Sequence, residues 1–506
     1  MIWVVGIWVL VVEGYGHFAV GDDVPEGRLV FPQLVQSRSE NGAKVLKVAD
    51  DLVFTLTKSG NIFGENFIVR TFKEDGYTME EHTLNAADFE KDLYQDKDKM
   101  AAVMVKEQEG LQVEGVLGLG LRIRPMPEME RSDYGHVAHV VYEVEEGDSH
   151  LTRAVRETSH RAQVSERRGE QYNAVMPFII YPEIHIISDS THVSYFKDGM
   201  TSAVEYYGIF INAVNLRYQS VSSPEVSLKI MGITLNSEKE DKNYIFPIPT
   251  SSTDQIWGVE SLYNVTHYIA KKHLYKDYDI VYLTTGLDLL GYEKDGRPES
   301  YRGFGFEGTA CEYFKTGIGE DWLRRFTGVH TFAHEIAHIL GCPHDGDYAS
   351  TALLNAPGSR HCPWTDGYIM SYKDTGLKHF MFSQCCNDMM SYTARRNPCL
   401  REKNVYTGHT NATKFPGEVI NLSKQCSWWY PTVNETYAMT NYAMGICRVK
   451  CFMPKYYLGW ETHTVIPVLD GTPCMSREDQ RVYDNKTACY NGVCQKKRKI
   501  TSRKKQ

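Results

Sequence analysis

Apolar and polar residues alternate along several stretches of the chain, and this two-residue period predicts strands that bury one face. The alternation runs through 51–72, 136–145 and 178–190, and 225–235 also has strand character. An almost continuous apolar run at 277–285 is typical of a strand that is covered on both faces. The pattern predicts a strand-rich N-terminal region and a buried central strand further along the chain.

Helical periodicity occurs at 205–220, 259–275 and 326–340, where apolar residues gather on one face. The first two stretches alternate with the strands of 178–285, which indicates an α/β layer. Regular patterns fade after Leu400, where cysteine, glycine and proline become frequent. We therefore expect a β-rich region, an α/β domain and a small irregular domain, in that order.

The composition is that of a globular protein with more than one domain: 506 residues, 42% hydrophobic and 24% charged. The net charge is −9, and we expect no nucleic-acid partner. Only the segment 496–505 is strongly basic, with no acidic residue. It is either a solvated tail or an anchor for sulfated glycans and anionic surfaces.

The chain begins with an apolar run, MIWVVGIWVLVV, which is too short to span a membrane. The run is typical of the hydrophobic region of a secretory signal peptide, although no basic residue precedes it. A buried strand is the alternative. Since no other stretch is long and apolar enough for a membrane span, we expect a secreted, extracellular protein.

Cysteine usage agrees with secretion. All twelve cysteines lie at or after Cys311, six of them before position 400 and six after it. Two even sets indicate two separately closed disulfide frameworks, formed in an oxidising compartment. Five sequons for N-linked glycosylation fit the same compartment, at Asn264, Asn411, Asn421, Asn434 and Asn485.

A charged segment at 153–173 contains Arg153-x-x-Arg156 and the pair Arg167-Arg168. It is polar and poor in apolar residues, so it reads as an exposed linker that processing proteases could cut. An ordinary surface loop is the alternative.

His334 and His338 lie four residues apart, on one face of the helix predicted at 326–340. Two imidazoles at this spacing can bind one Zn²⁺, and Gly341 can end the helix so that His344 returns as a third ligand. Three nitrogen ligands and an open position are typical of a catalytic zinc site. Glu335 is next to the first ligand, where it can hold a water.

The stretch HEIAHILGCPHD fits H-E-x-x-H-x-x-G-x-x-H, the zinc signature of the metzincin metalloproteases. Asp345, after the third histidine, resembles the reprolysin branch, which includes the snake-venom, ADAM and ADAMTS metalloproteases. Residues 366–372, DGYIMSY, are similar to the Met-turn of metzincins, with Met370 as its methionine. The alternatives are core histidines and a core methionine without a metal.

The resemblance implies an α/β metzincin domain with a mixed, mainly parallel twisted sheet, a zinc helix and a Met-turn. The segment GFGFEGTAC is similar to the reprolysin edge strand that pairs with the bound peptide, so Gly305, Phe306, Glu307 and Gly308 are expected to line the cleft. Asp345 is expected to organise the base of the domain without a catalytic role, and His330 to be structural.

The resemblance also implies disulfide pairs. By analogy Cys311 pairs with Cys399 and Cys362 with Cys385, which leaves Cys342 and Cys386 as a third pair, although connectivity does not follow from sequence alone. A disulfide at Cys342 would pin the loop that carries His344.

Outside the protease, 115–144 resembles the core of reprolysin prodomains, and DGTPC and CYNGVC resemble the ADAMTS cysteine-rich domain. The layout is similar to that of secreted salivary metalloproteases of ticks. We expect a signal peptide at 1–19, a β-rich prodomain at 20–172, a metalloprotease domain at 173–402, a disulfide-rich domain at 403–495 and a basic tail at 496–506.

Two features depart from the family pattern. No cysteine precedes Cys311, so a prodomain cannot silence the zinc with a thiolate and must use steric cover or an Asp or His ligand. Glu183 stands where a calcium-binding glutamate is expected, but the residues after Cys399 differ, so Ca²⁺ binding stays open.

The sequence thus predicts a secreted zinc endopeptidase in which Glu335 is the general base. Extracellular proteins such as matrix components, fibrin(ogen) or host-defence proteins are the expected substrates. Two alternatives are a binding protein with a vestigial protease and a zinc hydrolase of small esters. The intact zinc residues count against the first alternative, and the edge strand counts against the second.

Overall fold

The structure is a computed structural model of the whole chain. The residues that it describes are 26–35, 44–118, 120–144, 152–155, 179–248, 254–292, 296–371, 373, 376–403, 405, 416–430, 433–439, 447–458, 460–469, 471–474, 487–490 and 493–497. The expected signal peptide, most of the basic tail, Arg156, the Arg167-Arg168 pair and two sequons, Asn411 and Asn485, lie outside these residues. Among the described residues, no helix is both long and apolar enough to cross a membrane.

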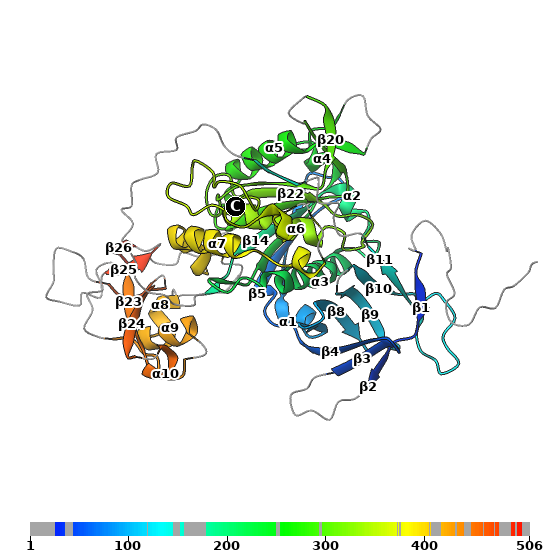
Figure 1. Ribbon diagram of the computed structural model, residues 1–506, viewed down its shortest axis with the longest axis horizontal. Helices are drawn as coiled ribbons and strands as arrows, with labels where there is room; N and C mark the ends of the chain where they lie inside the picture. The colour runs from blue at the N-terminus through cyan, green and yellow to red at the C-terminus, as the bar shows by residue number, and fades with distance from the viewer. Residues whose placement is uncertain are drawn as a thin grey trace, which may run out of the picture. The chain divides into compact units, whose positions relative to one another are not determined.

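The chain divides into two compact units. The first consists of 1–169 and 176–407, and the second of 170–175 and 408–506. The predicted prodomain and protease domain therefore lie almost entirely within the first unit, and each unit is described by itself below (Figure 1).

A nine-stranded antiparallel sheet fills the N-terminal part of the first unit, where the sequence predicts strands. Its strands, in spatial order, are β1 (Arg28–Val30), β11 (His139–Glu143), β10 (Leu121–Pro125), β9 (Gln112–Leu117), β8 (Ala101–Lys106), β7 (Leu93–Asp96), β4 (Leu52–Lys58), β3 (Lys44–Ala49) and β2 (Gln33–Val35). One-face alternation places Leu46, Leu56, Val103 and Val113 in a fully buried apolar core.

The second large sheet has eight strands and is mixed. In spatial order they are β12 (Thr152–Val155), β21 (Gly303–Phe306), β22 (Thr316–Glu320), β18 (Ile280–Thr285), β14 (Glu183–Ser188), β16 (Lys229–Leu235), β5 (Phe63–Phe72) and β6 (Met79–Asn85). Only the β21–β22 and β5–β6 pairs are antiparallel. Three of these strands come from the predicted prodomain, so the sheet crosses the predicted boundary at 172.

Helices cover both faces of this sheet, as the run at 277–285 predicts. In β18, Ile280 and Tyr282 belong to the core beneath α3 (Met200–Tyr218) and α6 (Val329–Ile339), whereas Val281 and Leu283 belong to the core beneath α5 (Gly258–Lys271). Figure 1 shows α5 on one side of the sheet and α3 and α6 on the other. Alternate side chains of a strand point to opposite faces, so a central strand must be apolar throughout.

Shorter elements complete the first unit. A three-stranded sheet contains β17 (Gln255–Trp257), β19 (Asp288–Tyr292) and β20 (Pro298–Tyr301), and a two-stranded sheet contains β13 (Ile179–Ile180) and β15 (Glu225–Val226). The remaining helices are α1 (Ala86–Glu90), α2 (Ser190–Val193), α4 (Glu238–Asp241), α7 (Gln384–Arg396) and the 3₁₀ turns η2 (His273–Tyr275), η3 (Trp364–Asp366), η4 (Leu377–Phe380) and η5 (Pro398–Arg401).

Element boundaries differ from the predicted ones where loops interrupt a pattern. The alternating stretch 51–72 forms two strands, β4 and β5, and 225–235 forms β15 and β16. The helix predicted from 205 begins earlier, at Met200. β4 and β5 belong to different sheets, and an alternating pattern does not show that the chain changes from one sheet to another.

The second unit is small and held by disulfides. It contains α8 (Pro416–Val419), α9 (Leu422–Trp429), α10 (Lys455–Leu458), the hairpin of β23 (Arg448–Met453) and β24 (Thr462–Pro467), and the hairpin of β25 (Thr487–Tyr490) and β26 (Val493–Lys496). Three disulfides link it, Cys426–Cys451, Cys447–Cys489 and Cys474–Cys494. Every pair in the protein joins two cysteines of the same predicted set.

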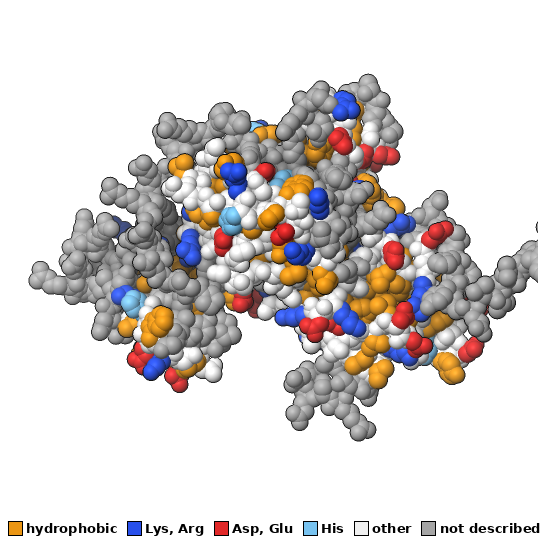
Figure 2. Space-filling model, in the orientation of Figure 1, with side chains coloured by type: hydrophobic (Ala, Val, Ile, Leu, Met, Phe, Trp, Pro, Cys, Tyr) orange, Lys and Arg blue, Asp and Glu red, His pale blue; other side chains and the backbone are white. Residues whose placement is uncertain are grey.

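Charge is mixed on the described surface. Figure 2 shows acidic and basic side chains interspersed on the face that it presents, with hydrophobic side chains gathered over part of the nine-stranded sheet. On this face, the described residues form no surface patch with charges of only one sign.

Candidate metal centre and active site

The helix α6 ends sharply, and its end decides where the third histidine lies. Gly341 has a φ of +106°, and a Cβ at this position would lie 2.1 Å from Oγ1 of Thr393. Glycine is therefore required twice, for the left-handed turn and for the close approach of Thr393. The amide of Cys342 then donates to the carbonyl of Ala337 at 2.9 Å, and the chain turns back toward the helix.

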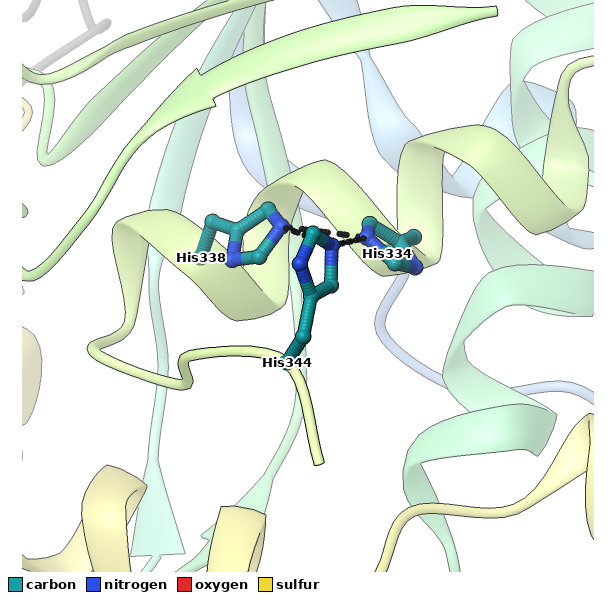
Figure 3. A group of neighbouring side chains, drawn as sticks. All are labelled: His334, His338 and His344. Carbon is teal, nitrogen blue, oxygen red and sulfur yellow. Dashed lines mark hydrogen bonds between the residues drawn. The ribbon is translucent and has the colours of Figure 1, made fainter. Parts of the chain in front are cut away.

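This turn brings three imidazole rings together. Nε2 of His334 lies 3.0 Å from Nε2 of His338 and 3.1 Å from Nε2 of His344, and the last two atoms are 3.2 Å apart. Figure 3 shows His334 and His338 projecting from the helix and His344 meeting them from the loop that follows it. A tetrahedral zinc with ligands at 2.0–2.1 Å would separate such nitrogens by about 3.3 Å, so the triangle has the size that a zinc ion needs.

Hydrogen bonds at the far side of two rings show which nitrogen of each ring carries the proton. Nδ1 of His334 donates to the carbonyl of Ile369 at 2.8 Å, and Nδ1 of His338 donates to the carbonyl of Cys342 at 2.7 Å. A carbonyl only accepts, so each Nδ1 carries the proton and each Nε2 presents a lone pair. Burial lowers the pKa of His334 to about 4, which also keeps the ring neutral. The residues present therefore fit a bound zinc ion.

Glu335 follows His334 in α6 and is fully buried. Neither carboxylate oxygen has a hydrogen-bond partner, and burial raises the pKa of Glu335 well above its ordinary value. A Cβ on Gly303 or Gly305 would lie 3.0 Å or less from atoms of Glu335. The two glycines of β21 thus leave just enough room for this carboxylate, and an unpaired buried carboxylate requires a water or substrate partner.

The segment around Met370 forms hydrogen bonds with His334 and with Asp345, the residue after His344. Met370 is fully buried, its carbonyl accepts from the amide of Asp345 at 2.9 Å, and the neighbouring carbonyl of Ile369 accepts from His334. Oδ1 of Asp345 accepts from the hydroxyl of Ser383 at 2.6 Å, and Ser383 caps α7. Burial raises the pKa of Asp345 to about 6. These contacts tie the loop of His344 to α7.

The predicted substrate-binding residues fall into two groups. Gly305 faces Glu335 and Gly308 donates its amide to the carbonyl of His338, so both lie along the zinc helix. The side chain of Phe306 points the other way, into the core beneath α5, and Oε1 of Glu307 accepts from the amide of Ser350 at 2.6 Å. Phe306 can therefore offer only backbone groups to a peptide in the cleft.

Three disulfides frame the first unit: Cys311–Cys399, Cys342–Cys386 and Cys362–Cys385. These are the pairs that the resemblance implies. The backbone carbonyl of Cys342 accepts a hydrogen bond from Nδ1 of His338. Among the sequons, Asn421 and Asn434 are exposed and Asn264 is half-buried.

Glu183 is the first residue of β14 and is buried next to Asp279. Its Oε2 accepts from the amide of Val405 at 2.8 Å, and its own amide donates to Oδ2 of Asp279 at 2.9 Å. Burial raises the pKa of Asp279 to about 7. Sequence analysis did not single out Asp279, whose only signal was its position at the start of the buried strand.

Asp321 was also missed, although it holds the start of the zinc helix. Its Oδ1 accepts from the amide of Gly328 at 2.9 Å, and its Oδ2 accepts from the hydroxyl of Tyr206 at 2.6 Å and lies 3.0 Å from Nε2 of His192. The partners come from three separate elements, so no local pattern could have revealed them. His330, expected to be structural, stacks on His379 with ring centroids 4.2 Å apart.

Three converging imidazole nitrogens beside an unpaired buried carboxylate define the centre of a metal-dependent hydrolase. Residues 183–383 match the sequence profile of metallo-peptidase family M12, of the reprolysin type. This part of the chain is similar to the reprolysin-type metallopeptidases, and the protein is a zinc metalloendopeptidase.

Relatives agree with this class. Venom metalloproteinase antarease TserMP_A of Tityus serrulatus is 26% identical over 386 residues, which cover 73% of this chain and 92% of that protein. Venom metalloproteinase BumaMPs1 of Olivierus martensii is 26% identical over 398 residues, covering 76% and 95%. A Bombyx mori protein, "A disintegrin and metalloproteinase with thrombospondin motifs like", is 26% identical over 395 residues, covering 66% and 56%.

Solved structures add little. Metalloproteinase-II from Bacteroides fragilis matches with a TM-score of 0.31 and 13% identity, over 62% of this chain and 82% of that chain.

Proposed function

We propose that the protein hydrolyses internal peptide bonds of extracellular proteins, with zinc held by His334, His338 and His344 and with Glu335 as the general base. The observation that carries this proposal is the carboxylate of Glu335, buried and unpartnered beside three convergent Nε2 atoms. A carboxylate in that environment is poised to take a proton rather than to neutralise a neighbouring cation.

Each residue has one task. The three histidines hold the metal, and the carbonyls of Ile369 and Cys342 fix the rings of His334 and His338. When bound, the zinc ion acidifies a water and polarises the carbonyl of the substrate. Glu335 takes a proton from that water and later gives it to the leaving amine. The main chain of β21 aligns the peptide, and Met370 and Asp345 support the floor of the site.

Replacing the base tests the proposal directly. Glu335→Ala should fold and retain one zinc per chain, while hydrolysis of a casein or gelatin substrate falls by at least a hundredfold. Zinc content by mass spectrometry and kcat/KM on one preparation give both readings. Glu299→Ala, on the exposed strand β20, is the matched control and should keep the parent's activity. Hydrolysis near the parent's rate by Glu335→Ala would exclude the role of Glu335.

The proposed substrates follow from the relatives and from the features that fit secretion. The relatives named above are venom proteins in two cases, and a signal peptide, six disulfides and sequons all fit secretion. We therefore propose a secreted enzyme with matrix, fibrin(ogen) or host-defence proteins as substrates and N-linked glycans at the five sequons. Cleavage of a proteome-derived peptide library by the processed enzyme would define the preferred sequence.

Two accessory sites remain proposals. Calcium would be held by Glu183 together with Asp279, because the two buried acidic residues are linked by the hydrogen bond from the amide of Glu183 to Asp279. Calorimetric titration of the parent and of Asp279→Asn with Ca²⁺ would decide it, and equal heats would exclude the site. The basic tail would retain the enzyme on sulfated glycans, which elution from heparin with and without residues 496–506 would measure.

A further inference from the structure

A cavity of about 330 Å³ lies where the end of α5 meets the chain segments that precede β18 and β22. Four of the residues that line it are lysines: Lys271, Lys272, Lys276 and Lys315. Within this lining, Glu312 is the only carboxylate. The cavity is therefore positively charged, although the whole chain has a net charge of −9. This difference favours a negatively charged ligand.

The end of a helix explains only part of this charge. Lys271 is the last residue of α5 and Lys272 is its C-cap, where the helix dipole stabilises a cation. Lys276 follows η2 and Lys315 directly precedes β22, so lysines from three segments meet at the cavity. In the part of the chain that the structure describes, Lys276 pairs with Asp277 at 3.9 Å, and the other three lysines form no ion pair with a carboxylate.

Lys315 places an ammonium group in the wall of the cavity. The residue is only 7% exposed, and its Nζ donates to the carbonyl of Lys276 at 2.9 Å and to the carbonyl of Tyr278. An ammonium group has three N–H donors, so one remains without an acceptor among the described residues. A buried charged donor needs a further partner, and an anion in the cavity would supply it.

An aromatic ring borders the lysines. Tyr313 lines the cavity and is 51% exposed. Its ring packs edge-on against Phe314, with centroids 5.0 Å apart, and its centroid lies 6.0 Å from that of His267. The ring is thus held at the surface by its neighbours. A sugar ring has an apolar face that can stack on such a side chain, while lysines bind the sulfates of a sulfated sugar.

The cavity and the three histidines lie on opposite faces of the mixed sheet. Ile269 and Tyr275, which line the cavity, belong to the core beneath α5, whereas α6 covers the other face (Figure 1). A ligand in the cavity therefore leaves the three-histidine centre uncovered. Such a site can tether the protein to a ligand without competing with a peptide for that centre.

We propose that this cavity binds a sulfated polysaccharide: the ring of Tyr313 stacks on one sugar unit, and the four lysines pair with the sulfate groups around it. The cavity is at the lower end of the usual size of ligand pockets, about 300–1,000 Å³, so it takes a short stretch of the polysaccharide. The site is separate from the basic segment 496–505. It goes beyond the proposed peptidase function, because binding here does not require a peptide bond to be cut.

Removal of three surface charges tests the site. The uncut full chain is titrated calorimetrically with a heparin hexasaccharide at about 0.15 M NaCl. The triple variant Lys271→Gln, Lys272→Gln, Lys276→Gln should raise Kd at least tenfold, because each change removes a charged hydrogen bond to a sulfate. All three side chains are exposed, so the fold should be unaffected.

Two controls match this variant. Arginine at the same three positions keeps the charge, and Kd should stay within about threefold of the parent's value. The second control removes three exposed lysines elsewhere and should bind as the parent does: Lys73→Gln, Lys91→Gln and Lys97→Gln.

The aromatic ring and the sulfates are tested separately. Tyr313→Ala leaves the net charge unchanged and should raise Kd by about threefold to tenfold, whereas Tyr313→Phe keeps the ring and should bind as the parent does. A hyaluronan hexasaccharide, which has carboxylates but no sulfates, should bind the parent at least tenfold more weakly than the heparin hexasaccharide. Inorganic sulfate at the same sulfate concentration should not displace the heparin hexasaccharide, and displacement would reveal a site for free anions and contradict the proposal.

Further results would overturn the proposal. Absence of binding by the parent would exclude the site, and an unchanged Kd in the triple glutamine variant would assign glycan binding to the segment 496–505. An equal rise of Kd in the control that lacks the three other lysines would show that only the net charge matters. An unchanged Kd in Tyr313→Ala would exclude stacking on a sugar. None of these measurements requires hydrolysis, so a failure of the proposed peptidase function would leave this site standing.

Discussion

Two glycines decide whether the carboxylate of Glu335 has space. Gly303 and Gly305 lie in a strand, where glycine weakens the pairing, yet a Cβ at either position would press on Glu335. Their residue type is therefore explained by the close approach of Thr331 and Glu335 on α6 and not by the backbone, which is extended at both positions.

Gly305→Ala should displace the carboxylate of Glu335 and lower kcat/KM by about tenfold to a hundredfold, since small displacements of a catalytic group are costly. Zinc content should stay at one per chain, because no ligand is touched. Gly60→Ala is the control, as a Cβ there meets no atom within 4 Å. An active Gly305→Ala enzyme would show that Glu335 has room to move.

The disulfide at Cys342 would influence a bound metal through the carbonyl of Cys342, which accepts from His338. Removing the Cys342–Cys386 pair as a double alanine variant should loosen the carbonyl that orients His338 and weaken zinc binding by about tenfold to a hundredfold. A competition titration with a chromogenic chelator measures this affinity. The double alanine variant of Cys362–Cys385, the pair that joins the segment before η3 to α7, should bind zinc as tightly as the parent.

Elements are held in register by buried polar groups that bridge them. Asp321 joins the start of α6 to α3 and α2 through Gly328, Tyr206 and His192. In the N-terminal sheet, Nε2 of His139 on β11 accepts from the amide of Val113 on β9 at 2.9 Å. Removing the partners of either buried side chain would leave it without its hydrogen bonds and would lower the free energy of unfolding.

His139 makes the N-terminal sheet sensitive to acid. Burial lowers the pKa of His139 to about 4 from an ordinary value of 6.5, so on acidification the unfolded chain takes up the proton first. The stabilisation is complete above pH 6.5 and is lost as the pH falls toward 4, by up to about 3 kcal/mol.

Urea unfolding of the uncut protein at pH 7 and pH 5 measures this dependence. His139→Gln keeps an acceptor for the amide of Val113 but cannot be protonated in this range, so its stability should fall less on acidification. The half-buried His136→Gln is the control, and its pH dependence should match that of the parent. An unchanged slope in His139→Gln would assign the acid sensitivity to other groups.

At the scale of the whole molecule, the first unit is one folded body in which predicted domains share a sheet and a core. The predicted boundaries remain predictions, but β5 and β6 show that the N-terminal region completes the sheet of the protease. The second unit is built around its own three disulfides.

Metal removal should therefore lower the free energy of unfolding of the whole first unit. Zinc binds the folded triangle and not the unfolded chain, so chelation should reduce the free energy of unfolding by about 4 kcal/mol when free zinc had exceeded its Kd a thousandfold. Calorimetry with and without chelator measures the shift in Tm. The variant His334→Ala, His338→Ala should show no such shift, and a full shift in this variant would place the stabilising ion elsewhere.

The sequence by itself determined which three histidines come together, the helix that carries two of them and the buried central strand. These features are local: a four-residue spacing, a glycine after the helix and an unbroken apolar run each have a direct physical meaning. The division of the cysteines into two sets was equally visible, because pairing stayed within each set.

Only the tertiary structure decided which distant groups support the site. Ile369 orients His334 through a backbone carbonyl that any residue type would provide, and Asp321 gathers partners from elements more than a hundred residues away. The pairing of β5 and β12 with opposite edges of the protease sheet also has no sequence signal. Nearly every residue type offers the same backbone donor and acceptor. The sequence therefore does not show which distant strands pair, and the pairing is visible only in the folded structure.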